Sequence, residues 1–181
     1  GTLAGDSVVG KTNNAVAVGY RAATLSNADK FVAVGDSAFA NGKGDGSIAI
    51  GYQALDATIT GAAQNVAIGY SALGANTTGL QNTAVGYEAG ALTTTYRYNT
   101  FVGYRAGYST DFREKLTAIG CQALENAPGG TECVAIGYLA GKARGNDADG
   151  GSVMVGNDSA AGSSSTAIGH RADAGSWSDS I

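Results

Sequence analysis

The sequence predicts an all-β protein, a parallel β-solenoid of about ten coils. Three observations lead to this fold class. One short phrase recurs ten times, β-branched residues alternate with alanine inside it, and glycine is abundant at 29 residues while proline occurs once. A repeat that runs through a whole chain dictates its architecture, because each unit buries its apolar surface only against its neighbours.

The repeated phrase is Ala-(Val/Ile)-Gly-x-x-Ala, and its glycine serves as position 0 of each coil. The successive glycines are 16, 16, 18, 17, 17, 17, 17, 19 and 13 residues apart. Clear repeats span residues 13–173 of a single domain, 1–181, and residues 174–181 form a tail or the start of a further segment. We expect the chain to be a piece of a longer protein. The phrase glycines are Gly19, Gly35, Gly51, Gly69, Gly86, Gly103, Gly120, Gly137, Gly156 and Gly169.

The residues before the glycine predict a strand. Position −1 is always Val or Ile, position −3 is Val, Ile or Thr, and position −2 is Ala in every copy except those with Phe101 and Met154. β-branched residues favour strands, and alternation places positions −1 and −3 on one face and position −2 on the other. We expect the larger apolar face to fill the core, with Val85 inward and Ala84 towards another chain.

The residues after the glycine carry different chemistry. Position +2 is polar in nine of ten copies, which indicates a solvent face, whereas position +3 is Ala in all copies but that of Ser159. Position +1, a tyrosine in six copies, is expected to share with position +3 the side away from water. The tyrosine ladder then fills a subunit interface or offers aromatic faces for stacking sugars. Its members are Tyr20, Tyr52, Tyr70, Tyr87, Tyr104 and Tyr138.

The phrase glycine is expected to turn the corner between two strands, because a residue without Cβ tolerates a positive φ or a close approach. Each coil would then hold two strands of roughly four or five residues, and the stack would form a rod on the order of 45 to 50 Å long. A core of small side chains is thin, so a second buried surface is needed. Three chains packed around one axis would supply it.

Composition excludes several classes of function. The net charge of −4 and the lack of a basic stripe argue against nucleic acid as a partner. The sequence contains no run of 18 apolar residues, so we expect no insertion of this segment into a membrane. The two cysteines, Cys121 and Cys133, have neither metal-site nor disulfide-framework spacing, and Cys121 is interpreted as a small buried residue in a tyrosine position.

Residues that could carry chemistry are few. A weak calcium candidate, which has neither the third acidic ligand nor the closing glutamate of a calcium loop, is formed by Asn146, Asp147 and Asp149. The single histidine, His170, occupies a tyrosine position and is expected to pack or face solvent. The carboxylates of Asp36, Glu88 and Asp158 belong to different coils, so a glycosidase pair would need neighbouring coils or chains. We predict no cofactor and no metal.

Three phrases carry a family resemblance: Asn65-Val-Ala-Ile-Gly-Tyr70, Asn82-Thr-Ala-Val-Gly-Tyr87 and Ser165-Thr-Ala-Ile-Gly-His170. They resemble the YadA-like head repeats of trimeric autotransporter adhesins, a left-handed parallel β-roll with a Ser/Asn-x-Ala-Ile-Gly core. The Asn-Thr-Ala-Val-Gly-Tyr-x-Ala form also resembles repeats in the tail fibres of phages and other large viruses. The resemblance covers about residues 7–173. It implies a homotrimer, intertwined or side by side, and supplies no catalytic residue.

The expected function is therefore non-enzymatic. We expect a structural and receptor-binding module of a trimeric extracellular fibre, a viral tail fibre that attaches to a glycan or protein on the host surface. An alternative is the adhesive head of a bacterial trimeric autotransporter on the outer-membrane surface. A third is a tailspike-like enzyme that degrades polysaccharide.

Overall fold

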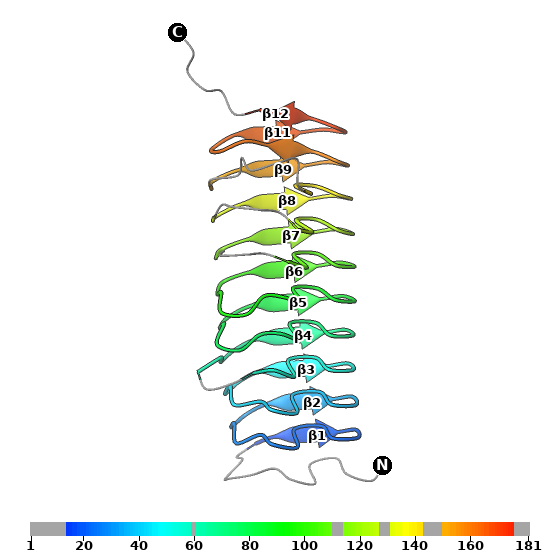
Figure 1. Cartoon of the computed structure of the whole chain (residues 1–181), viewed down its shortest axis with the longest axis vertical. Helices are drawn as coiled ribbons and strands as arrows, with labels where there is room; N and C mark the ends of the chain where they lie inside the picture. The colour runs from blue at the N-terminus through cyan, green and yellow to red at the C-terminus, as the bar shows by residue number, and fades with distance from the viewer. Residues whose placement is uncertain (1–13, 59–60, 110–113, 127–130, 143–149, 176–181) are drawn as a thin grey trace.

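The computed structural model describes residues 14–58, 61–109, 114–126, 131–142 and 150–175. Over these ranges the chain is all-β, without a helix, and its strands stack along one long axis as a β-solenoid (Figure 1). The predicted fold class is confirmed. This part of the chain contains no helix that is long and apolar enough to cross a membrane.

One three-residue strand from each repeat joins a ten-stranded parallel sheet, in sequence order apart from the omission of β10. Equal positions of the phrase stack on one another: Val66 lies opposite Thr83, and Ile68 opposite Val85. The strands are β1 (Val16–Val18), β2 (Val32–Val34), β3 (Ile48–Ile50), β4 (Val66–Ile68), β5 (Thr83–Val85), β6 (Thr100–Val102), β7 (Thr117–Ile119), β8 (Val134–Ile136), β9 (Val153–Val155) and β11 (Thr166–Ile168).

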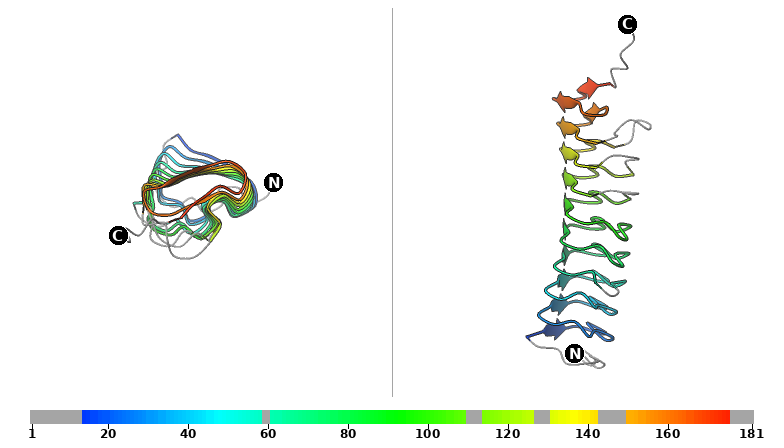
Figure 2. Two further views of the ribbon diagram at one scale, coloured as in Figure 1. Left: turned by 90° about the horizontal axis from the view of Figure 1, so that it is seen from above. Right: turned by 90° about the vertical axis from the view of Figure 1, so that its left-hand side faces the viewer.

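The two faces of this sheet are the reverse of the prediction. Ala84 at position −2 is fully buried, whereas Val85 at position −1 is partly exposed. The core lies between the sheet and the segment that returns on the other side of the coil, which is also lined by alanines such as Ala89 (Figure 2). Two walls packed this closely accommodate methyl groups, and the bulkier branched side chains are left outside.

The alternation also breaks at a different residue from the one expected. It continues through the glycine to position +1, so Tyr87 is exposed together with Val85. The break comes at position +2, where the residue adopts a left-handed φ of 49 to 58° in every copy, including 52° at Glu88. Ala89 at position +3 therefore points inward. The expectation that positions +1 and +3 share one side is wrong.

Among the described residues, a second strand forms only at the C-terminal end, where β10 (Ala160–Ala161) pairs in parallel with β12 (Asp173–Ala174). In the earlier coils position +4 is also left-handed, with φ of 49° at Leu73 and 59° at Gly90, and a left-handed residue cannot continue a strand. Hydrogen bonds still join these coils, since the Leu73 N–H donates to the Ala89 carbonyl at 3.0 Å. The prediction of two strands in every coil is wrong.

The phrase glycines lie where the backbones of successive coils approach closely. Gly86 has a φ of +140°, and a Cβ built on it would lie 2.3 Å from the carbonyl oxygen of Gly103 in the next coil. Gly169 has a similar φ of +134°, but a Cβ there would meet only the Ala172 Cβ at 3.8 Å. The corner thus requires glycine on two separate grounds, backbone conformation and space.

The exceptions at position −2 are matched by small residues at position +4. Phe101 is fully buried, and a Cβ on Gly90 or Gly107 would lie 2.7 or 2.3 Å from its ring. In three of the coils with alanine at position −2, a leucine fills the core from position +4: Leu55, Leu73 and Leu124. The core volume is therefore kept by an exchange between the two positions.

A ladder of buried asparagines runs under the sheet at position −4. The Oδ1 atoms of Asn65, Asn82 and Asn99 accept hydrogen bonds from the backbone N–H groups of Asn82, Asn99 and Leu116 at 2.9, 3.0 and 2.9 Å. The Asn82 amide also donates to the Tyr96 carbonyl at 2.7 Å. These side chains satisfy buried backbone groups between strands and loops. Sequence reasoning did not identify these residues, although asparagine occupies position −4 in three consecutive coils and this pattern is typical of such a ladder.

Candidate functional site

The first candidate surface is the outward side of the ten-stranded sheet, made by positions −3 and −1 and called here the sheet face. It is almost entirely Val, Ile and Thr, and Val18, Ile68 and Ile136 expose 55, 37 and 38 % of their surface. Ten strands at ~4.8 Å spacing and about 15 Å across give an area on the order of 700 Å², the tyrosine row included. Monomers rarely expose an apolar patch beyond ~300–600 Å².

The tyrosine ladder borders the sheet face, because the chain bends at each phrase glycine and the next side chain points outward. Four consecutive rings stack: the centroids of Tyr52 and Tyr70, Tyr70 and Tyr87, and Tyr87 and Tyr104 lie 5.1, 4.9 and 5.4 Å apart, with interplanar angles of 17, 10 and 13°. Tyr20 and Tyr138 stand apart, since Asp36 and Cys121 occupy the intervening coils. All six rings are exposed.

The stacking decides which part of each tyrosine a ligand could reach. Tyr70 and Tyr87 have neighbouring rings on both faces, so only their edges and hydroxyls are open. A sugar ring stacks on an aromatic face, and among the four stacked rings a face is open only at the two ends, on Tyr52 and Tyr104. Desolvation, followed by the charge of Glu88, raises the pKa of the Tyr87 hydroxyl above its ordinary value.

The second candidate surface lies across the coil from the sheet and is called here the return wall, positions +2 to +6. At its middle Arg105 joins several groups: its Nη1 lies 2.9 Å from Glu125 Oε1, and its Nε lies 3.2 Å from Glu88 Oε2 without hydrogen-bond alignment. Its guanidinium covers the Tyr108 ring at 4.0 Å from the centroid. Lys142 approaches the buried Glu125 from the next coil, at 2.7 Å.

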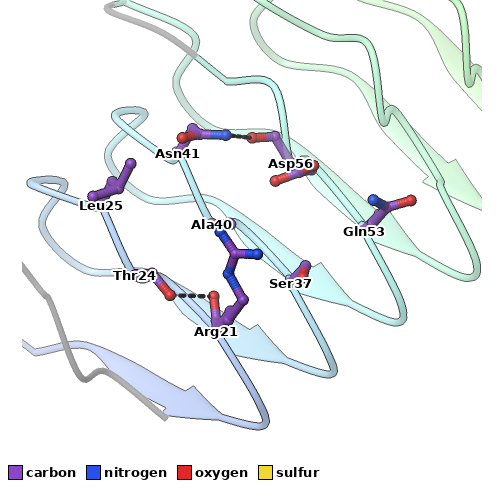
Figure 3. Close-up of a pocket in the computed structure, with 8 residues that line it drawn as sticks. All are labelled: Arg21, Thr24, Leu25, Ser37, Ala40, Asn41, Gln53 and Asp56. Atoms are coloured by element: carbon purple, nitrogen blue, oxygen red, sulfur yellow. Dashed lines mark hydrogen bonds between the residues drawn. The ribbon is translucent and has the colours of Figure 1, made fainter. Parts of the chain in front are cut away.

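The return wall is hollowed before it reaches this network. Two adjoining hollows, of about 150 and 280 Å³, share Gln53 and Asp56 as lining residues. Figure 3 shows the first, with Arg21 and Asp56 on either side of Ala40. Burial raises the pKa of the Asp56 carboxyl, and the Arg21 charge opposes this effect. Sequence reasoning marked position +2 as a polar solvent face but did not detect a groove.

The other candidate residues are not brought together. Asp36 is exposed at the corner beside the sheet face, where it accepts a hydrogen bond from Ser37, whereas Glu88 and Asp158 lie on the return wall. His170 is exposed in the last coil. The calcium candidate, Asn146, Asp147 and Asp149, lies outside the described residues.

Both cysteines are free in the structure. Cys133 is buried in the core, while Cys121 is only half buried beside the tyrosine ladder, rather than buried as expected.

Comparison of the chain with protein-family models, with curated proteins and with solved structures gives no match.

Proposed function

We propose that this chain is a rod-forming and receptor-binding segment of a trimeric extracellular fibre, of the kind that viral tail fibres carry. The observation behind the proposal is the sheet face, an apolar surface that runs unbroken from β1 to β11 in a register of equal residues. Such a surface is expected to be covered by another molecule. A second copy of the chain offers the same repeat along its axis.

The size of the face suits a specific interface. The sheet face and the tyrosine row together cover on the order of 700 Å², which approaches the ~800 Å² that each partner contributes to a standard protein interface. The branched side chains of positions −1 and −3 would then be buried between chains, whereas the alanines fill each chain's own core. This arrangement supplies the second buried surface that a thin coil needs.

Three-fold symmetry suits the shape better than two-fold. The sheet face and the tyrosine ladder meet at an angle along the glycine corner, so one chain presents two adjoining surfaces. Contacts between different surfaces on identical subunits close into rings, and three rods around a common axis form such a ring. All chains then run in one direction, as a fibre with distinct ends requires. The return walls face outward, where a receptor could reach them.

Sedimentation equilibrium over a range of micromolar concentrations tests the proposal. We expect one species of three times the 17.9 kDa chain mass at all these concentrations. A single-chain mass at all concentrations would contradict the trimer and with it the fibre.

A further inference from the structure

The groove in the return wall has a built shape that the repeat alone does not require. At position +5, its floor, the side chains of Ala40, Gly74 and Ala91 are small, so the wall is recessed there, and Asp56 holds the same position where the two hollows adjoin. The row becomes large at Tyr108, which lines one end of the groove. The hollow therefore follows the rod axis over about the first six coils.

The lining combines the groups that bind sugars. Asp56 and Glu88 supply carboxylates, Gln53 supplies an amide, and Ser71 adds a hydroxyl. Carboxylates accept hydrogen bonds from sugar hydroxyls, and the amide and hydroxyl groups both accept and donate them, so hydroxyls that point in different directions can be bound. Leu92 provides an apolar wall for the C–H side of a ring. Ligand sites are commonly concave and hold a few fixed polar groups beside apolar surface.

One end of the groove is held rigid by the ion network. Glu88 pairs with Arg105, which also contacts the buried Glu125 and covers one face of Tyr108. A site whose walls are fixed before binding loses less entropy when the ligand arrives. The stacked tyrosines suit sugars less well, because the faces of Tyr70 and Tyr87 that could stack on a sugar ring are covered by neighbouring rings.

The charge of the groove selects among ligands. Each carboxylate of the two hollows has a guanidinium nearby, since the charge of Arg21 acts on Asp56 and Arg105 pairs with Glu88. The groove therefore has no excess positive charge to hold a sialylated or phosphorylated ligand, whereas neutral sugars bind through hydroxyls and amino sugars gain from the carboxylates.

We propose that this groove binds a neutral or amino-bearing oligosaccharide that lies along the rod axis. The inference rests on the proposed function, for which it names the receptor class and the surface that binds it. The groove lies across the coil from the sheet face, so it stays open when three chains associate. Three parallel grooves on one fibre would bind a dense glycan surface with an avidity far above that of a single site.

The test uses an array of four probe classes: neutral hexose oligomers, N-acetylhexosamine oligomers, deacetylated hexosamine oligomers, and sialylated or phosphorylated oligomers. The most strongly bound oligomer is then titrated by calorimetry against the parent chain and three variants. Asp56→Ala removes a lining carboxylate, and Ser71→Trp fills the groove. Asp158→Ala removes a carboxylate from the return wall at position +2, the position of Ser71, outside the groove.

We expect binding from the first three classes alone. Asp56→Ala should weaken it about tenfold, the loss of one charge-assisted hydrogen bond, and Ser71→Trp should abolish it. Asp158→Ala should leave it unchanged. Binding of the anionic class, or equal binding by all variants, would overturn the inference.

Sedimentation of the same samples separates two kinds of failure. A trimer that binds no oligomer on the array overturns the groove site and leaves the fibre standing, whereas a monomer overturns the proposed function itself. Circular dichroism of each variant shows that any lost binding comes from a folded chain.

Discussion

The sheet face and the return wall differ in how far the repeat governs them. Position −1 of the sheet face is Val or Ile in every coil, while positions +2 and +5 of the return wall change charge and size from coil to coil. The constant surface lies beside the close contacts between coils, and the variable one holds the groove and the Arg105 network. Uniform positions thus serve stacking and association, and irregular positions are where a specific ligand would be recognised.

The largest effect is expected where stacking itself is blocked. Gly86→Ala would place its Cβ 2.3 Å from a backbone oxygen in the next coil, and no side chain can move to relieve this contact. We expect a loss above about 4 kcal/mol in the free energy of unfolding, as for the most damaging mutations, measured by urea denaturation.

Gly169→Ala is the matched control for the blocked corner. It has the same place in the phrase and a similar φ, but space above it. Backbone strain alone should cost about 1 to 3 kcal/mol. Equal losses in the two variants would show that strain, and not the approach of coils, makes glycine necessary.

A smaller effect, which a second substitution should partly undo, is expected in the core between the sheet and the return wall. Phe101→Ala should cost about 3 to 5 kcal/mol through the cavity it leaves. Adding Gly107→Leu gives this coil the combination found in the Leu73 coil, alanine at position −2 and leucine at position +4, and Leu73 shows that leucine adopts the left-handed φ required there. The double variant should recover part of the loss in urea unfolding, whereas Gly107→Leu alone should destabilise. A double variant less stable than both single ones would refute the exchange.

The smallest effect concerns the return wall. Burial raises the pKa of Asp56, so the folded chain binds this proton more tightly than the unfolded chain does. The protonated carboxyl therefore contributes its full stabilisation below the ordinary carboxyl pKa, and this stabilisation is lost as the pH rises through the raised value. Asp56→Asn should therefore be slightly more stable than the parent at pH 7 and equal to it at pH 3. Thermal unfolding at both pH values checks this, and a gain that persists at pH 3 would contradict the assignment.

The fold could be predicted from the spacing of the repeat, because ten glycines at nearly constant intervals leave few alternatives to a stack of coils. The direction of the side chains was not. The usual preference for burying the larger apolar residue placed Val85 inside and Ala84 outside, but in this coil the alanine faces the narrow core and the valine lies outside. The alternation of a strand also gave no sign that Glu88 would turn left-handed and reverse the sides that follow.

The groove could not be predicted for a related reason. Its shape depends on position +5, which lies outside the conspicuous phrase and shows no regular pattern. Ala40 and Gly74 look unremarkable in the sequence, and only the stacking of coils shows that they form one floor. The ion network is similar, because Arg105 and Glu125 meet across coils.

The central claim is that copies of the chain associate through the sheet face and leave the return wall open. Two variants of one coil test it: Ile68→Lys places a charge on the sheet face, and Ser71→Lys places the same charge on the return wall, where Arg21 and Arg105 show that a long cation fits position +2. Their masses are measured by sedimentation equilibrium at equal concentration, with circular dichroism to confirm folding. We predict that folded Ile68→Lys is a monomer and Ser71→Lys a trimer. A trimer for Ile68→Lys, or a monomer for Ser71→Lys alone, would contradict the claim.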